Sequence, residues 1–497
     1  MADVVVVGGG VGGMATAIRL GSAGHHVTLV ERNADLGGKL AARRVDGFTF
    51  DTGPSLLTLP QVFDELLALT GTSLAEAVDL VRLDPICRYT WPDGAPGGAA
   101  TFDHRADRVD AVAEAGAAFP GQGEAFDAWL DHGRTIWQVA ERSFFAGPLE
   151  SPVALLRRMR RPGDLLAVDP LRTLTSRARQ VFDDPRLVQW AGRYATYSGS
   201  SPALAPATLA CIPWIEQAFG AWYVRGGLAV LATALEKATA GVGVEVRTGV
   251  EVEAIRADTA AVRGVRLAGG EVLDADVVVA NVDATHLYAD LLPDARFLRR
   301  TLRAPLSSSG FALLLGVEGG AAAPRRPAHH EISFSPDGPT EFRQIFDAGR
   351  APLDPTIYLC NTSATDPSAA PDGCESWFVL VNVPPAGSVD WDGEADRYRD
   401  HLLDRLAARG FDVAGRTRVC EVITPLDIAA ATRSWQGSIY GTSSNGRRAA
   451  FLRPSNRGPR RGLYLVGGSS HPGGGLPLVA MSGRIVADMV AGDGWRP

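Results

Sequence analysis

Three glycines near the N-terminus have the spacing of a turn that binds nucleotide phosphates. The apolar run Val4–Val7 leads directly into Gly8-x-Gly10-x-x-Gly13, and a segment with helical periodicity follows. In such a turn the first glycine permits the tight bend, the second lets a pyrophosphate approach the backbone, and the third lets helix and strand pack closely. The free N–H groups and positive dipole end of the helix hold the phosphates. Glu31, about twenty residues further on, is placed to accept hydrogen bonds from ribose hydroxyls.

The segment that follows Glu31 and Arg32 distinguishes FAD from NAD. A second glycine turn, Gly37-Gly38-Lys39, precedes the loop Asp51-Thr52-Gly53-Pro54-Ser55, where an NAD dehydrogenase would continue into another βα unit. Such a loop suits a cofactor whose long ribityl arm runs through the domain toward a substrate cavity. Gly-Gly and Gly-Pro also occur in ordinary surface turns, which is the structural alternative. No second dinucleotide motif follows, so we expect FAD and not NAD.

A glycine-rich loop near the C-terminus is the third candidate element of the site. It runs from Gly467-Gly468 through His471 to Gly475-Leu476-Pro477, and a helical pattern follows. The positive end of that helix could face the N1/C2 edge of a flavin and stabilise its anionic reduced form. Gly475 allows close approach to the ring, and Pro477 suits a first helical turn. His471 is the one titratable residue of the loop and the candidate for a direct role in the chemistry, with a structural role as the alternative.

These blocks at opposite ends of the chain resemble the flavin-dependent bacterial carotenoid desaturases of the phytoene-desaturase type, within the wider glutathione-reductase-like and amine-oxidase-like group. The resemblance extends over residues 223–292 and is weak over 103–219 and 293–425, where such enzymes diverge with substrate. The C-terminal loop with Ser482-Gly483, and the segments 438–441 and 55–58, look most like the hydroxycarotenoid 3,4-desaturase branch. Phytoene- or lycopene-type desaturases and carotenoid oxidases share nearly the same cofactor-binding segments, so both remain alternative assignments.

The resemblance implies an α/β fold with a discontinuous Rossmann-like FAD-binding domain of the glutathione-reductase/amine-oxidase type and a mixed α+β substrate domain. We expect FAD binding by residues 1–89, 222–287 and 438–497, and a partly membrane-facing substrate domain over 90–221 and 288–437. In the family the position of Val250 offers backbone hydrogen bonds to the adenine, and an ordinary sheet residue is the alternative. The residues expected to contact FAD are Gly8, Gly10, Val11, Gly12, Gly13, Glu31, Arg32, Gly38, Lys39, Leu40, Gly53, Pro54, Ser55, Val250, Gly468, Gly475, Leu476 and Pro477.

The activity that the resemblance implies is desaturation of a long apolar carotenoid by hydride transfer to flavin, with 3,4-desaturation of an acyclic hydroxycarotenoid as the finer expectation. The flavin carries the hard chemistry, so a strong general base need not be visible. Expected partners are a lipophilic polyene, a membrane surface, and quinone or oxygen as electron acceptor. The alternatives are an amine or porphyrinogen oxidase with a smaller, more polar substrate, and a prenyl-binding protein without turnover, like the Rab escort and GDP-dissociation-inhibitor proteins.

Composition excludes several other classes of protein. A chain of 497 residues is long enough for two domains. Its net charge of −7 argues against nucleic acid as a partner. The five cysteines are odd in number and show no CxxC spacing, which favours a reducing cytoplasm and argues against disulfides or a zinc site. The histidine pairs His25-His26 and His329-His330 are expected in turns or at strand edges, so no metal is predicted.

One segment has the composition of an interfacial membrane anchor. Aromatic and apolar residues at 143–149 precede the leucine- and arginine-rich stretch 155–161. Because only Lys39 and Lys237 are lysines, an arginine bias makes a solvated surface the alternative. No stretch reaches the roughly 18 apolar residues of a membrane span, and the N-terminus lacks the basic start of a signal peptide. We therefore expect a cytoplasmic protein, peripherally bound at the inner face of the membrane.

Hydrophobic periodicity gives a coarse secondary structure. Helical patterns occupy residues 111–118, 123–139, 176–193, 227–240 and 478–489. Residues 27–30 and 276–281 read as buried strands of a parallel sheet. Extended runs are expected at 311–317, 341–346, 356–359 and 377–383, as a sheet floor beneath helices.

Overall fold

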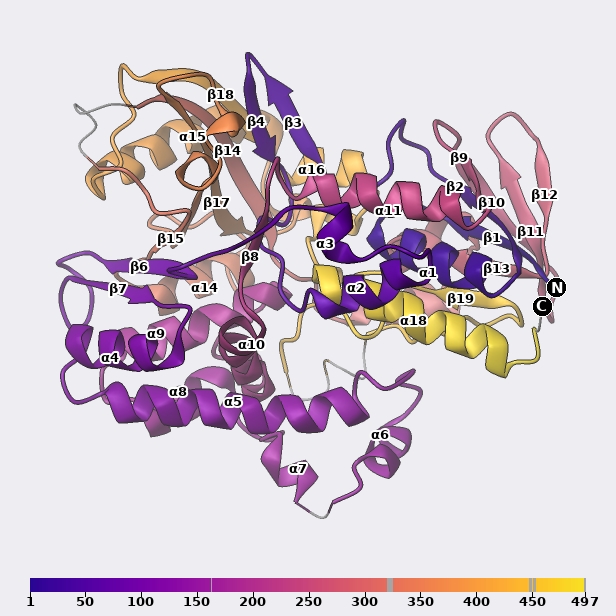
Figure 1. Cartoon of the computed structure of the whole chain (residues 1–497), viewed down its shortest axis with the longest axis horizontal. Coiled ribbons are helices and arrows are strands. Elements are labelled where there is room, and N and C mark those ends of the chain that lie inside the picture. The colour runs from indigo at the N-terminus through magenta and orange to yellow at the C-terminus, as the bar shows by residue number, and fades with distance from the viewer. Residues whose placement is uncertain (162, 320–324, 447–448, 450–452, 496–497) are drawn as a thin grey trace.

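Two large β-sheets organise the chain, and helices pack around both of them (Figure 1). The computed structural model describes residues 1–161, 163–319, 325–446, 449 and 453–495. The parallel sheet lies at one end of the molecule and the second sheet at the other, with a layer of helices below.

The first sheet has five parallel strands in the order β19-β13-β1-β2-β9. The strands are β1 Asp3–Val7, β2 His26–Val30, β9 Glu245–Arg247, β13 Val277–Ala280 and β19 Leu463–Leu465. Because neighbouring strands run in one direction, their carboxyl ends meet at a single edge of the sheet. Gly8, Glu31 and Asn281 directly follow three of these strands, so all three meet at that edge.

The valines of β1 alternate between two cores. Val4 and Val6 pack with helices α1 Val11–Ser22, α11 Ala229–Gly241 and α18 Leu476–Gly492. Val5 and Val7 face the opposite side, where the antiparallel strands β10 Val252–Ala257, β11 Val262–Leu267 and β12 Val272–Asp274 cover the sheet. Burial on both faces explains why the strand is apolar throughout.

The second sheet has seven strands in the order β18-β14-β17-β16-β15-β6-β7. All neighbours are antiparallel except β15 and β6. One face packs on helix α15 Trp391–Ala408, and the other face lines the cavity described below. The strands are β6 Cys87–Trp91, β7 Ala100–His104, β14 Ser309–Glu318, β15 His330–Ser333, β16 Ile357–Asn361, β17 Cys374–Val383 and β18 Thr417–Ile423.

A helical layer lies below the second sheet in Figure 1, and α6 Pro152–Arg158 and α7 Asp164–Ala167 project from it. The layer itself contains α4 Arg108–Ala118, α5 Gly123–Ser143, α8 Leu174–Val181, α9 Pro185–Arg193 and α10 Cys211–Phe219. Further elements are β3 Ala42–Val45, β4 Phe48–Asp51, β5 Leu80–Arg82, β8 Trp222–Val224, α2 Gln61–Ala68, α3 Leu74–Ala77, α12 Ala284–His286, α13 Ala295–Arg303, α14 Gly338–Phe346 and α16 Pro425–Thr432.

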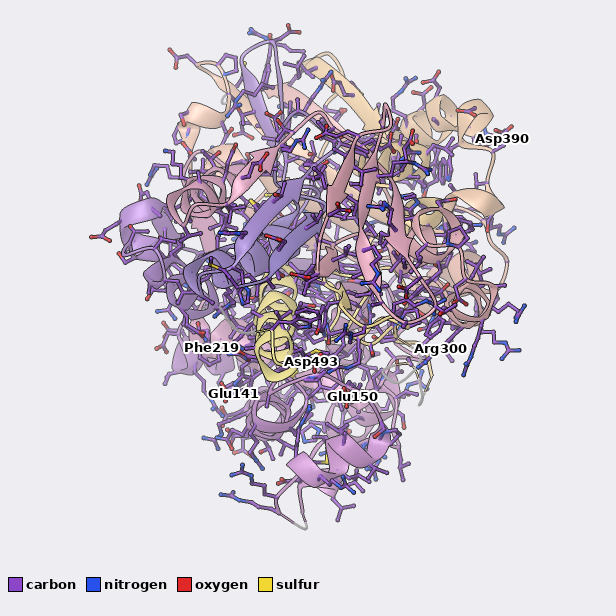
Figure 2. All side chains as sticks on the ribbon, turned by 90° about the vertical axis from the view of Figure 1, so that its right-hand side faces the viewer. Glu141, Glu150, Phe219, Arg300, Asp390 and Asp493 are labelled. Carbon is purple, nitrogen blue, oxygen red and sulfur yellow. The ribbon has the colours of Figure 1, made fainter. Side chains whose placement is uncertain are left out.

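Arg457 ties the projecting segment to the parallel-sheet end of the molecule. Its guanidinium forms an ion pair with Asp493, just beyond α18, and approaches Glu150 at 3.5 Å, just before α6. Figure 2 shows Asp493 at the end of α18 and Glu150 below it, on the side of the projecting helices. The projection therefore has a charged contact at its base and is not held by α5 alone.

The α/β class and the parallel sheet are confirmed, and β13 is fully buried as its valine run predicts. All five strands of that sheet come from the three segments assigned to FAD binding. Residues 87–89 at the end of the first segment instead pair in β6 of the second sheet. The division into two domains stays a prediction, and residues 447–448, 450–452 and 496–497 of its last segment lie outside the described residues.

Three expectations about local structure were wrong. Residues 341–346 form part of helix α14, because Asp337 accepts a hydrogen bond from the Thr340 N–H and Pro339 lies in the first turn. The helix expected at 176–193 is broken into α8 and α9, where Asp184 caps a new helix that begins at Pro185. His330 is buried and opens β15, which has a neighbouring strand on each side and is no sheet edge.

Candidate functional site

A single continuous cavity of about 2440 Å³ runs between the carboxyl edge of the parallel sheet and the second sheet. Small-molecule pockets usually measure roughly 300–1,000 Å³, so this space can hold more than one ordinary ligand. Every residue expected to contact FAD lines the cavity except Gly13. The wall continues past these residues to the apolar side chains of α6 and α7.

Backbone contacts shape the first glycine turn. A Cβ added at Gly13 would lie 2.1 Å from the Gly8 carbonyl oxygen, and one added at Gly8 would lie 2.6 Å from the Asn281 carbonyl oxygen. Gly13 thus acts through packing, which explains why it does not line the cavity. Helix α1 begins just after Gly10 with no side-chain cap and no acidic residue in its first turn. Its first N–H groups are therefore free to bind an anion.

Asn281 is a residue of this turn that sequence reasoning missed. Its side-chain amide donates a hydrogen bond of 3.0 Å to the Gly8 carbonyl oxygen, and it lines the cavity. The signal was present, because a polar residue directly follows the buried strand β13 at the carboxyl edge of the sheet.

The Glu31 carboxylate is buried at the cavity wall. It accepts hydrogen bonds from the Gly9 N–H at 2.7 Å and from the Asn33 N–H at 2.9 Å. Since each carboxylate oxygen can accept more than one hydrogen bond, both oxygens keep capacity for a diol. Arg32 has a different role, because its guanidinium donates to the carbonyl oxygens of Ala430 and Ala431 at the end of α16.

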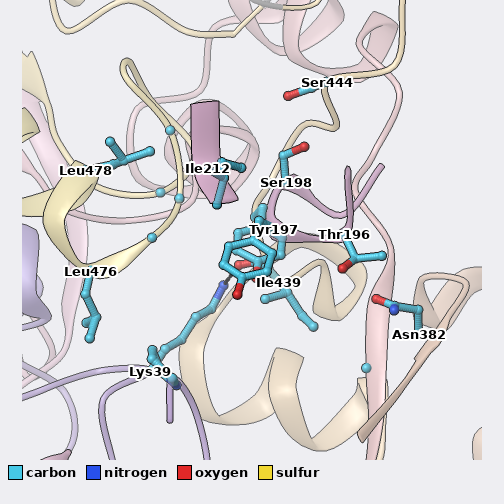
Figure 3. A pocket seen from close by; sticks show the side chains of 18 of the residues that line it. Lys39, Thr196, Tyr197, Ser198, Ile212, Asn382, Ile439, Ser444, Leu476 and Leu478 are labelled. Atoms are coloured by element: carbon cyan, nitrogen blue, oxygen red, sulfur yellow. Dashed lines mark hydrogen bonds between the residues drawn. The ribbon is translucent and has the colours of Figure 1, made fainter. Parts of the chain in front are cut away.

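Lys39 connects the second glycine turn to a distant part of the chain. Its Nζ donates to the Ile439 carbonyl oxygen at 2.6 Å and to the Ser438 carbonyl oxygen at 3.3 Å. Burial lowers the pKa of this ammonium to about 8. Figure 3 shows the Lys39 side chain pointing toward Ile439, in the same pocket as Tyr197 and Leu476.

Asp51, which opens the Asp-x-Gly-Pro loop, does not line the cavity. Its carboxylate accepts hydrogen bonds from Leu228 N–H at 3.0 Å and Ala229 N–H at 3.4 Å, where α11 begins. Burial raises the pKa of this carboxyl to about 6. The loop is thus anchored by its first residue, while Gly53, Pro54 and Ser55 face the cavity.

The C-terminal loop brings the start of α18 to the cavity. Gly475 has a φ of +119° and precedes the helix, which has no side-chain cap and no acid in its first turn. Gly468, Gly475, Leu476 and Pro477 all line the cavity. Arg453, which sequence reasoning missed, also lines the cavity and supports the loop by donating to the carbonyl oxygen of Gly468 at 2.7 Å.

His471 is not among the cavity-lining residues, and its geometry argues against the suggested role in the chemistry. Its Nε2 lies 3.0 Å from the Phe144 carbonyl oxygen and 3.2 Å from that of Gly147. Burial lowers the pKa of the imidazole to about 4, so the ring is neutral at physiological pH. We therefore assign His471 a structural role, in which it connects the end of α5 to the C-terminal loop.

A second polar region of the cavity is a buried cluster from α9, the turn after it and α10. Arg193 donates to the hydroxyl of Tyr89 at 2.8 Å and to that of Tyr197 at 3.3 Å. Tyr197 and Tyr194 in turn donate to the two oxygens of Glu216 at 2.5 and 2.9 Å. Arg193, Tyr197 and Glu216 line the cavity, whereas Tyr89 and Tyr194 do not. No sequence motif indicated this cluster. Four of its members come from the segment where the resemblance is weak, and Tyr89 comes from β6.

The residues at the sheet edge fit FAD. Two helix N-termini with open N–H groups, a buried carboxylate and two glycine turns converge on one end of the cavity. The chain matches the family described as flavin-containing amine oxidoreductase over residues 11–491. It belongs to that family. FAD is therefore its cofactor and the protein is an oxidoreductase.

Several curated proteins that resemble this chain along nearly its whole length are carotenoid enzymes. The chain is 36% identical to a 4,4'-diapolycopene oxygenase of Methylomonas sp, over 99% of this chain and 98% of the relative. It is 33% identical to a 1-hydroxycarotenoid 3,4-desaturase of Flavobacterium sp. (strain P99-3), over 99% of each chain. A 4,4'-diaponeurosporene oxygenase of Staphylococcus aureus is 34% identical over 98% of this chain and 97% of its own. These relatives confirm the carotenoid desaturase-type family.

Solved structures show the same fold at low identity. Putrescine oxidase with bound putrescine has a TM-score of 0.66 at 14% identity, covering 99% of both chains. An oxidoreductase from Methanosarcina mazei has a TM-score of 0.65 at 17% identity, covering 98% of this chain and all of its own.

Gly13→Ala should weaken FAD binding by a factor between about 5 and about 150, since forcing a methyl group against a rigid backbone oxygen costs roughly 1–3 kcal/mol. The measurement is the flavin-to-protein absorbance ratio after gel filtration at limiting FAD. Gly241→Ala is the matched control, because it also lies in a helix and has open space at its Cβ. Equal flavin content in the two variants would contradict the role given to Gly13.

Asp51→Asn should remove one component of the pH dependence of stability. The folded carboxyl has a pKa of about 6, whereas an unfolded Asp titrates near 3.9. Between these values the folded chain holds a proton that the unfolded chain has lost, so stability falls as pH rises. Relative to the variant, the wild-type free energy of unfolding should decrease by about 3 kcal/mol across that interval. Urea denaturation measures it, Asp93→Asn on an exposed turn is the control, and parallel profiles for wild type and Asp51→Asn would refute the assignment.

Proposed function

We propose that this protein is a FAD-dependent desaturase of a long acyclic carotenoid that carries oxygen near one end, with 3,4-desaturation as the specific reaction. The observation that carries the proposal is the continuity of the cavity. It starts at the FAD-binding residues, passes the Arg193 cluster and reaches the projecting helices α6 and α7.

The far part of the cavity suits an extended apolar molecule. A small amine or porphyrinogen ring would not need its length. The apolar residues that line this part come from α5, α6, α7 and α10 and from the turns after α6, α7 and α8, and include Ile136, Leu155, Met159, Leu165, Val168, Phe182, Ile212 and Ile215. Burial of apolar surface is the main driving force that such a wall offers to a polyene.

The Arg193 cluster supports an oxygen at one end of that substrate. A guanidinium has five N–H groups, and the hydrogen bonds to Tyr89 and Tyr197 use two of them. A buried charge in an apolar cavity is costly unless it is fully hydrogen-bonded. A hydroxyl group of the substrate would supply a missing acceptor.

When bound, FAD would supply the hydride acceptor. The positive charge left on the substrate is spread over its conjugated chain, and it is removed when the neighbouring carbon releases a proton to the medium and the new double bond forms. The residues of the chain bind the flavin and the polyene and orient them toward each other. The N-terminal end of α18 and the Lys39 ammonium place positive charge beside the flavin region, and the apolar wall excludes water. We propose quinone or oxygen as the final electron acceptor.

A second candidate is oxygenation of the polyene. The names of two relatives favour it, and the cavity would serve equally well. A prenyl-binding protein without turnover is the least favoured alternative, because its function does not require FAD.

The decisive experiment mixes FAD-loaded protein anaerobically with phytoene, lycopene or a 1-hydroxylated acyclic carotenoid in liposomes. The proposal predicts flavin bleaching and a red-shifted polyene with the hydroxylated substrate. Tyr197→Phe should slow that reaction about ten-fold, the effect of one lost hydrogen bond to a polar partner, and should leave a hydrocarbon unaffected. Tyr89→Phe is the control, since it touches Arg193 from outside the cavity.

Bleaching with phytoene alone would overturn the substrate assignment. Oxygen incorporation from labelled O₂ into the product would favour the oxygenase. Yellow protein that bleaches with none of the three polyenes would rule out carotenoid oxidation.

We also propose that α6 and α7 rest on the inner face of the cytoplasmic membrane and admit the polyene from it. The described residues contain no helix that is long and apolar enough to cross a membrane. Yet Leu156 and Leu166 are exposed in this projection, Leu166 to 83%. Apolar side chains flanked by arginines suit an interfacial contact with anionic lipid. Arg158 does not belong to this set, because it donates to the carbonyl oxygens of Gly147 and Pro148.

Changing Arg157, Arg160 and Arg161 together to Ser should weaken co-sedimentation with anionic liposomes. Each basic residue near such a surface contributes about 1 kcal/mol, so a loss of binding of about a hundred-fold is expected. The matched control changes Arg296, Arg299 and Arg300 of α13 to Ser. Equal liposome binding by the two triple variants would contradict the proposal that this projection contacts the membrane.

A further inference from the structure

A compact group of metal-ligating side chains lies at the cavity wall and has no role in the proposed oxidation. One ring nitrogen each of His329 and His330 and the sulfur of Cys360 lie within 4.8 Å of one another. His330 and Cys360 are directly opposed on the antiparallel strands β15 and β16. All three side chains are buried, with exposed fractions of 7, 3 and 2%.

The unused nitrogen atoms of the two imidazoles indicate a ligand. His329 Nδ1 lies 2.7 Å from the Thr365 hydroxyl, and His330 Nδ1 lies 2.8 Å from the Tyr358 hydroxyl. Within the described part of the chain, the buried Nε2 atoms of both rings have no hydrogen-bond partner. Buried polar atoms normally have partners, so two such vacancies within one small group require an explanation.

We propose that His329, His330 and Cys360 form a binding site for a thiophilic cation, Zn²⁺ or Cu⁺. Two imidazole nitrogens and one thiolate are the donor set that such ions prefer. Zinc-ligand distances of about 2.0–2.3 Å place neighbouring ligand atoms roughly 3.4–3.6 Å apart. The three side chains therefore need to close in by about 1 Å around the ion. Binding displaces the thiol proton of Cys360 to solvent or buffer.

The surroundings of the histidines have the form of an outer shell of a metal site. A metal-bound imidazole usually hydrogen-bonds through its other nitrogen, which fixes its orientation, and the Thr365 and Tyr358 hydroxyls do this here.

The site is connected to the FAD-lining loop. The Tyr358 hydroxyl, which contacts His330, also lies 2.5 Å from the Ser55 hydroxyl. Ser55 and His330 both line the cavity, which gives an ion a path of entry. The bound ion would clamp β15 to β16 and so fix the Tyr358 ring that supports Ser55. We infer a structural role for the ion and assign it no step in the oxidation.

Metal binding to the full-length, FAD-loaded protein tests the proposal without reference to activity. After treatment with a chelator, the protein is incubated with Zn²⁺, or with Cu⁺ under reducing anaerobic conditions, and gel-filtered. We expect about one equivalent per chain of one of the two ions and a higher Tm. Cys360→Ser and His329→Gln should each lose the stoichiometric metal, whereas Cys420→Ser and His286→Gln, outside the cluster, should retain it.

X-ray absorption of the metal-loaded wild type covers the case in which a variant fails to fold. One sulfur and two imidazole nitrogens in the first coordination shell would support the site. A shell without sulfur, or wild-type protein that retains neither ion, would overturn it. So would stoichiometric metal that persists in both Cys360→Ser and His329→Gln.

Discussion

The close approach of two backbone segments at the edge of the parallel sheet is the constraint on which the rest of the site depends. Gly8 and Gly13 meet without side chains between them, so α1 can start directly at the end of β1 with its first N–H groups open. Glu31 and Asn281, from the strands on either side, then brace the same turn. A phosphate site of this kind has no room for a Cβ atom at these positions. Glycine is therefore required there because of close packing and not because of its flexibility.

Long-range contacts connect the glycine turns at this edge to segments nearer the substrate part of the cavity. Lys39 reaches the carbonyl oxygens at 438–439, and Asp51 holds the start of α11. Both residues connect parts of the chain that are far apart in sequence. The cavity is a single space, with the residues proposed to bind FAD at one end, the Arg193 cluster along its wall and the projecting helices at the other.

The cofactor end could be predicted from sequence because its signals are local. A valine run, a glycine spacing and an acid at a fixed distance report on one βαβ unit, and β1, α1 and β2 formed as those signals indicate. The Arg193 cluster could not be predicted, since its members come from β6, α9, the turn after α9 and α10 and meet only in the folded chain. His329, His330 and Cys360 show the same limit, because strand pairing and not spacing brings the sulfur to the imidazoles. The prediction of an extended segment at residues 341–346 failed for a local reason. Asp337 caps a helix there, and this helix-start signal outweighed the extended apolar pattern.

The most direct test of the account is a crystal structure of the protein with FAD and a 1-hydroxylated acyclic carotenoid. The account predicts the flavin ring between the Lys39 turn and the start of α18, the substrate oxygen at Arg193 or Tyr197, and the far end of the polyene between α6 and α7. A polyene bound outside this cavity, or one whose oxygen lies at the α6–α7 end, would contradict the central claim.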